Sequence, residues 1–453
     1  METIAAVSTP AGKGGIAVIR ISGDGAFALA DRIFFPASGK KPGEYPRRYA
    51  IYGKIALGGE EIDDGLITLF AAGRSFTGED TAEISCHGGM YVTSRVLEAV
   101  LACGARPAQA GEFTRRAFMN GVLTLSQAEA TGGIIDAKTQ VHLSVAHAQL
   151  GGALTKTIDA MSSELRNIAA SVYAYIDYPD EDMTDLSIEE MRTRLTKCRE
   201  KADRMLGGRK YMKAVSEGVR CAIIGKPNTG KSSLLNALAG YDRAIVTDIE
   251  GTTRDVVTEQ VTVGSVLLLL SDTAGLRESF DPVEKVGIEH TKRNIASAEL
   301  LLAVFDASEK PDALDEEVIS LISEKRACCI AVLNKSDKKA RYAGEYSSRF
   351  ENSVIVSTKT LEGFDKLAHM IGEICGENEF GGADEIMLSA RQNAALIRAR
   401  DAINDALVTL DSFTQDIAVS DIESALGALG EIDSRSVSED IVNEIFSKFC
   451  VGK

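Results

Sequence analysis

The stretch Gly225-Lys226-Pro227-Asn228-Thr229-Gly230-Lys231-Ser232 stands directly after the apolar run 219–224 and before the helical run 233–239. It matches G-x-x-x-x-G-K-[ST], a phosphate-binding loop, in the strand, loop and helix order that this motif requires. Its glycines allow the backbone to wrap closely around phosphates, so that N–H groups and the helix N-terminus face the anion. We therefore expect Lys231 to add charge at the β- and γ-phosphates and Ser232 to offer its hydroxyl to Mg²⁺.

The residues that read the base are expected at the ends of two later strands. Asn334-Lys335-Ser336-Asp337 closes the apolar run that ends at Leu333, and the Asp337 carboxylate can accept paired hydrogen bonds from guanine N1–H and the guanine amino group. Adenine offers no such pair, and a buried acceptor left unpaired is costly, so guanine is favoured and an ATPase is ranked far below. Ser357-Thr358-Lys359 occupies the position of a last base-contacting loop, although three residues are a weak signal alone.

Two further segments fit the same site. Asp272-Thr273-Ala274-Gly275 follows the apolar strand 266–270, so Asp272 can reach the water shell of the metal and Gly275 can give its N–H to a γ-phosphate. The polar stretch Gly251-Thr252-Thr253-Arg254-Asp255 suits a loop whose Thr253 joins Mg²⁺ only when the γ-phosphate is present. The GTP-binding set that these motifs predict is Asn228, Thr229, Gly230, Lys231, Ser232, Ser233, Gly251, Thr252, Thr253, Asp272, Thr273, Ala274, Gly275, Asn334, Lys335, Ser336, Asp337, Ser357, Thr358 and Lys359, and the family resemblance described below adds Thr247, Asp248, Ile249 and Glu250.

The residue that follows the D-x-x-G motif is Leu276, where many regulatory GTPases carry a water-orienting Gln. An apolar side chain cannot orient or polarise water, so either hydrolysis is negligible or another group supplies that function. A carboxylate of the segment 276–288 is one candidate, and a monovalent cation held by Asn228 beside the phosphates is another. Each acidic residue there is equally compatible with an exposed charge at a helix start.

The pattern along the chain predicts a multidomain α/β protein. Short β-type runs with glycine-rich turns predict an α+β domain over 1–119, and apolar residues at three- and four-residue steps predict helices over 120–216 and 381–453. Buried strands alternating with amphipathic segments predict an α/β domain with a mostly parallel sheet, of the Ras-like P-loop GTPase kind, over 217–380. The simplest arrangement is a helical-bundle domain that is built from both helical stretches and carries the α/β domain as an insertion, with two separate bundles as the alternative.

Composition and charge narrow the classes of function. The chain has 453 residues, 45% of them hydrophobic and 26% charged, which excludes global disorder. Its net charge of −16 repels polyanions at long range, so a nucleic-acid partner needs a local basic patch or a second protein to hold it. We expect no membrane segment, no secretory signal and therefore a cytoplasmic location, and eight scattered cysteines without a C-x-x-C pair indicate neither a disulfide framework nor a zinc site.

Further motifs occur along nearly the whole chain. They are Gly12-Lys13-Gly14-Gly15, Arg20-Ile21-Ser22-Gly23, Phe76-Thr77-Gly78-Glu79-Asp80, His87-Gly88-Gly89, the stretch 107–113, Gln127-Ala128-Glu129-Ala130, Asp177-Tyr178-Pro179-Asp180-Glu181 and the tail Phe449-Cys450-Val451-Gly452-Lys453. Together with the nucleotide motifs, this set resembles the MnmE (TrmE) family of tRNA-modification GTPases.

The resemblance implies three parts: an N-terminal α+β domain that binds a tetrahydrofolate derivative (5-formyl or methylene form) and dimerises, a helical domain, and an inserted GTPase domain. It implies a homodimer with K⁺-stimulated GTP hydrolysis that is coupled to pairing of the two GTPase domains. It also implies a heterotetramer with an FAD-containing protein of the MnmG (GidA) type, which installs an aminomethyl or carboxymethylaminomethyl group at carbon five of the wobble uridine in certain tRNAs.

The resemblance also assigns residues. It implies that K⁺ is held by Asn228, Thr247, Ile249 and Thr252, that Mg²⁺ is held by Ser232 and Thr253, and that Glu284 orients the attacking water. Folate contacts fall on Arg20 and Glu83, with Val122 and Lys453 at further positions of the folate site. Relatives usually carry Lys where this chain has Val122, so one cationic contact to the folate is missing.

Two residues have competing interpretations. In the family, the C-terminal Cys-x-Gly-Lys lies near the folate site, which favours a functional role for Cys450; burial of its thiol beside Phe446 and Phe449 is the structural alternative, and a prenylation box fits poorly. His87 is interpreted as a turn-stabilising residue.

A second function class is a binding switch of the ribosome-assembly type, which uses its nucleotide state to dock on RNA. The acidic balance disfavours direct docking on RNA, and Arg20, Glu83 and Cys450 have no purpose in that hypothesis.

Overall fold

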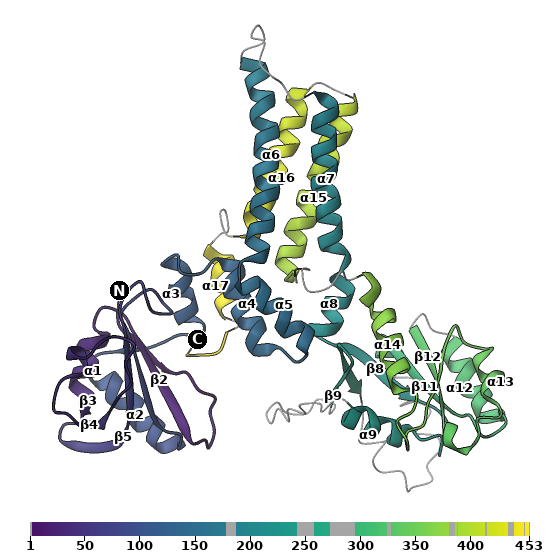
Figure 1. The fold of residues 1–453 in the computed structure, drawn as a ribbon, viewed down its shortest axis with the longest axis horizontal. Helices are drawn as coiled ribbons and strands as arrows, with labels where there is room; N and C mark the ends of the chain where they lie inside the picture. The colour runs from purple at the N-terminus through teal and green to yellow at the C-terminus, as the bar shows by residue number, and fades with distance from the viewer. Residues whose placement is uncertain are drawn as a thin grey trace. The chain divides into compact units, whose positions relative to one another are not determined.

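The computed structural model describes residues 2–177, 187–241, 258–271, 295–323, 328–379, 386, 388–412, 415–433, 439–447 and 449–452. The chain forms two compact units. One unit contains residues 1–132, 150–188 and 401–453, and the other contains residues 133–149 and 189–400. Figure 1 shows the helices and strands of both units along the chain.

The N-terminal part of the first unit is built on a seven-stranded sheet in the order β3-β4-β5-β6-β2-β1-β7. All neighbouring strands run antiparallel except β1 and β7, which are parallel. The strands are β1 (Ile4–Val7), β2 (Ile16–Ser22), β3 (Phe34–Pro36), β4 (Ile51–Leu57), β5 (Glu60–Phe70), β6 (Thr81–His87) and β7 (Arg106–Pro107), with helices α1 (Ala26–Ile33), η1 (Pro42–Glu44) and α2 (Met90–Ala102).

The two faces of this sheet differ in what covers them. Alternate residues such as Ile19, Ile21 and Ile84 are fully buried in a core that includes side chains of α1 and α2. The intervening residues point to the opposite face, because successive side chains of a strand alternate between faces. On that face, Tyr52 and Leu66 lie directly opposite each other on β4 and β5, and both are exposed.

The remaining helices of the first unit come from distant parts of the chain. Helices α6 (Ala153–Asp177) and α16 (Gln415–Ile432) lie side by side (Figure 1), and Tyr173 Oη donates to Glu423 Oε1 over 2.6 Å. Helices α3 (Glu112–Met119), α4 (Leu125–Asp136) and α17 (Glu439–Ser447) share a small core around Leu125 and Phe446. Segments from both sides of the α/β part therefore pack together in this helical region.

The second unit contains a six-stranded sheet in the order β13-β12-β11-β8-β10-β9, in which only β9 and β10 are antiparallel. Its strands are β8 (Val219–Ile224), β9 (Thr258–Val263), β10 (Val266–Ser271), β11 (Leu300–Asp306), β12 (Cys328–Asn334) and β13 (Asn352–Ile355). Strand β9 was not expected from the sequence. The predicted fold class, an α+β domain, a helical domain and a mostly parallel sheet, is confirmed.

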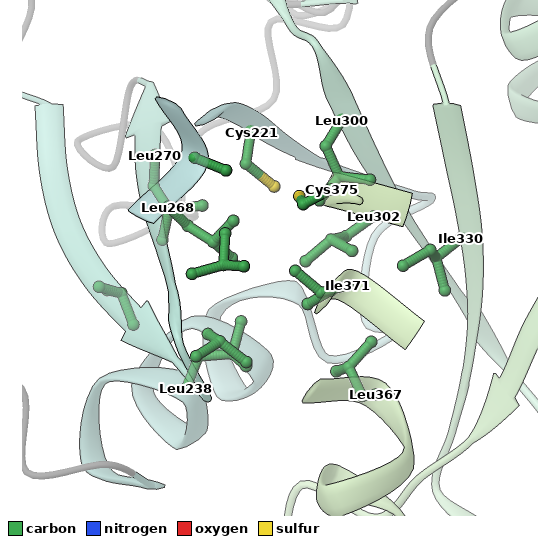
Figure 2. Close-up of a cluster of buried hydrophobic side chains, with 14 of the residues drawn as sticks. Cys221, Leu238, Leu268, Leu270, Leu300, Leu302, Ile330, Leu367, Ile371 and Cys375 are labelled. Carbon is green, nitrogen blue, oxygen red and sulfur yellow. The ribbon is translucent and has the colours of Figure 1, made fainter. Parts of the chain in front are cut away.

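Apolar side chains fill the space between this sheet and the helices that cover one of its faces. Figure 2 shows Leu268, Leu302 and Ile330 from three strands together with Leu367 and Ile371 of α14 (Phe364–Cys375). Helix α8 (Arg209–Ser216) adds Tyr211, Met212 and Val215 to the same core, so the core of this unit extends past the expected boundary at 217. Among the residues that the structure describes, the helices of this unit are α5 (Gln140–Leu150), α7 (Ile188–Gly207), α8 (Arg209–Ser216), α9 (Lys231–Tyr241), α12 (Ala313–Ser323), η2 (Ser336–Lys338), α13 (Ala343–Ser347), α14 (Phe364–Cys375), η3 (Glu377–Glu379) and α15 (Ala390–Ser412), the last of which continues into the first unit.

Within the described residues, no helix has both the length and the apolar character needed to cross a lipid bilayer. All eight cysteines are free thiols.

Candidate functional site

The phosphate-binding loop connects β8 to α9. Lys231 is the first residue of α9, and its ammonium donates to the carbonyl oxygens of Gly225 and Lys226, both over 2.8 Å. Thr229 is fully buried and donates to the Lys226 carbonyl over 3.0 Å, which closes the loop on itself. Burial lowers the pKa of Lys231 from its ordinary value of 10.5. The loop thus holds a half-buried cation at the start of a helix, where an anion is favoured.

Two glycines of this loop are required by their surroundings. Gly225 has φ +152°, and a Cβ at this position would lie 2.4 Å from the Val304 carbonyl oxygen. Gly230 has φ +100°, and a Cβ there would lie 2.2 Å from the Asn334 amide nitrogen. Glycine is therefore needed at both positions, because β11 approaches the phosphate-binding loop at Gly225 and Asn334 approaches it at Gly230.

Asn334 joins three loops through its side chain. Its Nδ2 donates to the Thr229 carbonyl over 2.9 Å, and its Oδ1 accepts a bond from the Thr358 amide over 3.1 Å. Asn334 is 1% exposed, so both bonds are shielded from water. The phosphate-binding loop, the 334–337 loop and the 357–359 loop are consequently fixed to one another.

Asp337 is held in place by the 357–359 loop. The Ser357 hydroxyl donates to Asp337 Oδ1 over 2.9 Å and accepts the amides of Lys359 and Thr360 over 3.3 and 3.2 Å. Ser357 is fully buried, whereas Asp337 is exposed. The weak three-residue pattern at 357–359 thus lies beside the carboxylate that was assigned to guanine.

Acidic residues outside the motifs pair with lysines of the two nucleotide loops. Lys335 Nζ donates to the Asn228 carbonyl over 2.7 Å and pairs with Asp306 over 2.6 Å. Lys226 Nζ pairs with Asp312 and Asp315, both over 2.8 Å. Reasoning from sequence missed these three aspartates; the one signal available for Asp306 was a carboxylate at the end of an apolar strand.

Many predicted site residues lie outside the described part of the chain. They are Thr247, Asp248, Ile249, Glu250, Gly251, Thr252, Thr253, Asp272, Thr273, Ala274, Gly275, Glu284 and Lys453. Ser232 and Ser233 lie in the first turn of α9, and Ser336 lies beside Asp337 in η2.

The N-terminal domain contains a second group of predicted residues, around Arg20 on β2. Arg20 and Glu83 lie directly opposite each other on β2 and β6, and Arg20 Nε donates to Glu83 Oε1 over 2.9 Å. The guanidinium carbon lies 5.3 Å from the ring centre of Phe76 and 5.7 Å from that of Phe113. This arrangement combines a fixed cation, a carboxylate and two aromatic rings, a set that suits a flat, partly anionic ligand.

Val122 lies beside the loop that carries Phe76. A Cβ on Gly78 would approach Val122 Cγ2 to 2.9 Å, and Asn120 Nδ2 donates to the Thr77 carbonyl over 2.7 Å. Val122 is 43% exposed, so an apolar side chain occupies this part of the surface. Arg20, Phe76 and Val122 are thus connected through the loop 76–80.

The C-terminal tail is also part of this region. Val451 pairs with Ala110, the Gly452 carbonyl accepts the Ser8 hydroxyl over 2.9 Å, and a Cβ on Gly452 would lie 2.1 Å from the Val7 carbonyl oxygen. Cys450 is exposed, so the alternative in which its thiol is buried beside two phenylalanines is wrong. The tail thus contacts the end of β1, the neighbour of the strand that carries Arg20.

The side chain of His87 contacts Asp63 on β5, 24 residues away in the sequence, and the turn-stabilising interpretation stays a prediction. Its backbone amide and its Nδ1 lie 2.8 Å from the two carboxylate oxygens of Asp63. Hydrogen bonding and charge from Asp63 raise the pKa of His87 above its ordinary value of 6.5.

The guanine assignment of Asp337 leads to a direct test. Asp337→Asn presents an amide that cannot accept both guanine donors, whereas xanthine offers a carbonyl in place of the amino group. We expect GDP affinity to fall at least about a hundredfold and XDP affinity to rise, since an unpaired buried polar group is costly. Titration calorimetry with GDP and XDP measures both; unchanged GDP affinity contradicts the assignment.

Comparison with known proteins agrees with this geometry. A family model described as the MnmE helical domain matches residues 125–450, and one described as the GTP-binding protein TrmE N-terminus matches residues 3–122. Proteins named tRNA modification GTPase MnmE from Symbiobacterium thermophilum, Clostridioides difficile and Roseiflexus sp. are 42%, 38% and 40% identical, over 100% of this chain and 99% of each relative. The solved structure of Era with MgGDPNP and a segment of 16S ribosomal RNA aligns with 41% of this chain and 66% of its own at 28% identity, with a TM-score of 0.27 that adds nothing to the assignment. The two family models and the full-length relatives show that the chain belongs to the MnmE (TrmE) family of tRNA modification GTPases.

Proposed function

We propose that this chain is a K⁺-stimulated GTP hydrolase that acts, as a homodimer, in modification of the tRNA wobble uridine. An FAD-containing partner of the MnmG type would form a heterotetramer with it, and together they would add an aminomethyl or carboxymethylaminomethyl group to carbon five of that base. The observation that carries the proposal is the Asn334 side chain, which fixes three nucleotide loops together in a chain of this family. The expected compartment is the cytoplasm.

Analysis of wobble nucleosides tests the proposal directly. We expect that cells lacking the gene lose the carbon-five substituent and that the wild-type gene restores it. A Lys231→Ala variant, which removes the phosphate-facing ammonium, should not restore it. Mass spectrometry of digested tRNA measures the substituent; unchanged nucleosides in the deletion strain overturn the proposal and leave the RNA-docking switch as the better hypothesis.

The described residues fit a magnesium nucleotide. The Lys231 ammonium already donates to two carbonyl oxygens, and phosphate oxygens are stronger acceptors for the same donor. Ser232 follows it in the first turn of α9 and offers a hydroxyl oxygen, the ligand type that Mg²⁺ prefers. When bound, Mg²⁺ neutralises charge on the β- and γ-phosphates, and Ser232 and Thr253 are its proposed ligands.

Asn228 fits a monovalent cation site. It is exposed and has φ +63°, a left-handed conformation that is uncommon outside glycine. A bound K⁺ supplies positive charge beside the phosphates, and its proposed ligands are Asn228, Thr247, Ile249 and Thr252.

The cation proposal predicts a salt-dependent rate. GTP hydrolysis by the wild-type protein should rise at least about tenfold when Na⁺ is replaced by K⁺ at constant ionic strength. Asn228→Lys places a fixed ammonium near the same point, so its rate should no longer depend on the choice of salt. Phosphate release assays in KCl and NaCl give both values, and equal wild-type rates in the two salts refute the K⁺ site.

Glu284 is the proposed water-orienting carboxylate, as the family resemblance implies, in a role that Leu276 cannot perform. Glu284→Ala should slow single-turnover hydrolysis by about a hundredfold or more while GDP affinity stays within twofold, because the residue acts on water and not on the nucleotide. A loss of affinity that matches the loss of rate rules out this role.

The region around Arg20 fits a tetrahydrofolate derivative. A pterin ring is flat and a folate tail carries carboxylates, which match the aromatic rings of Phe76 and Phe113 and the guanidinium of Arg20. When bound, the 5-formyl or methylene form supplies the one-carbon unit. The proposed contacts are Arg20, Glu83, Val122 and Lys453. Fluorescence titration with 5-formyltetrahydrofolate measures the affinity of this site, and absence of saturable binding contradicts it.

The outer face of the N-terminal sheet supports a homodimer. Ile16, Phe35, Tyr52 and Leu66 lie on four different strands and are 68%, 51%, 57% and 43% exposed. Apolar side chains gathered on one sheet face favour burial against another protein surface. We propose a second copy of this chain as the occupant, since one copy presents the same face to another.

The dimer proposal predicts a change of oligomeric state. Leu66→Lys places a charge at the centre of the apolar face and should raise the dimer dissociation constant at least about tenfold. Val408→Lys is a matched control, because Val408 is 56% exposed on α15, outside this face. Light scattering over a dilution series reports the mass; a Leu66→Lys protein that dimerises like the wild type argues against this surface.

A further inference from the structure

We propose that Asp306 is a positioning residue for guanine nucleotides: it fixes Lys335 on the Asn228 carbonyl and so connects the base-reading loop to the phosphate-binding loop. Asp306 belongs to none of the GTPase motifs. It is the last residue of β11, which lies between β8 and β12 in the sheet. The proposal rests on nucleotide binding as set out above and adds a residue to that site.

The geometry gives Asp306 one orientation. The Ser308 amide and hydroxyl donate to Asp306 Oδ1 over 3.0 and 2.6 Å, and this leaves Oδ2 to accept Lys335 Nζ over 2.6 Å. Only 3% of the Asp306 side chain is exposed. A carboxylate that is fixed by its own loop and shielded from water holds an ammonium in one place far better than a mobile surface charge does.

Lys335 connects Asp306 to the phosphate-binding loop. Its ammonium also donates to the Asn228 carbonyl over 2.7 Å, so a single side chain contacts β11 and the phosphate-binding loop. Opposing effects act on the Asp306 carboxyl: burial raises its pKa, but hydrogen bonds from Lys335 and Ser308 lower it overall from 3.8. The carboxylate therefore stays charged at neutral pH, as the contact requires.

Asn228, whose carbonyl accepts this ammonium, and Lys335 itself both have a left-handed backbone conformation. Asn228 has φ +63° and Lys335 has φ +66°, in the left-handed region that is sparsely populated by residues other than glycine. Such residues persist where surrounding contacts hold them, and they concentrate at functional sites. Here the buried Asp306 carboxylate holds Lys335 of the base-reading loop directly, and it holds Asn228 of the phosphate-binding loop through the Lys335 ammonium.

The consequence concerns nucleotide release more than phosphate cleavage. Without the negative charge of Asp306, Lys335 loses its fixed position, and the two loops separate more readily from a bound nucleotide. Loss of a charge-assisted bond predicts faster dissociation, whereas the chemical step on nucleotide that stays bound should change little.

The test uses Asp306→Asn in the full-length protein, since asparagine keeps the size and can still accept one bond. We expect the dissociation rate of a fluorescent GDP analogue to rise about tenfold, with single-turnover hydrolysis within twofold of wild type. Glu309→Gln is the matched control: it removes one negative charge three residues away, and Glu309 is exposed. This control should release the analogue at the wild-type rate.

A double variant separates positioning from a general structural role. If Asp306 acts through Lys335, Asp306→Asn should add nothing to the release rate of Lys335→Met. Full additivity of the two changes, or an unchanged release rate in Asp306→Asn alone, overturns the proposal. Failure of the wild-type protein to bind the analogue would instead overturn the proposed function, so the two failures are distinct.

Discussion

The Asn334 side chain is the constraint on which the nucleotide site depends. Its amide nitrogen and oxygen bond the backbone of two different loops, and only 1% of Asn334 is exposed, so both bonds start from a buried side chain. Parallel strands bring these loops to one edge of the sheet, because β8, β11, β12 and β13 all run in the same direction. The parallel strands bring the loops to the same edge, and the side-chain amide of Asn334 fixes the distance between them.

Buried ion pairs also hold the nucleotide loops in place. Lys335 and Lys226 are both held by aspartates, and Asp315 on α12 is completely buried. A buried ion pair is weak evidence for stability, because desolvation offsets most of the attraction. Its value here lies in geometry, since the pairs fix the phosphate-binding loop relative to β11 and α12. The same principle operates around Arg20, where Glu83 fixes a cation between two aromatic rings.

The positions of the described motif loops at strand ends could be predicted from the sequence, whereas their supporting partners could not. The phosphate-binding loop and the 334–337 loop follow buried apolar runs, so their place at strand ends was readable from the pattern. Strand β9 was missed because it follows a polar stretch and pairs antiparallel with β10, an arrangement that a parallel-strand pattern does not indicate. Asp312 and Asp315 were missed because they lie 86 and 89 residues from Lys226, and sequence spacing carries no information on such contacts. The interpretation of Cys450 as a buried thiol failed because the tail pairs with residue 110 and leaves Cys450 exposed.

Calorimetric titration of the wild-type protein with GDP and with ADP, in the presence of Mg²⁺, tests the central claim most directly. A site whose loops are fixed by Asn334 and whose base reader is Asp337 should bind GDP with micromolar or tighter affinity and show no saturation with ADP up to about 1 mM. Comparable affinities for GDP and ADP would contradict the account.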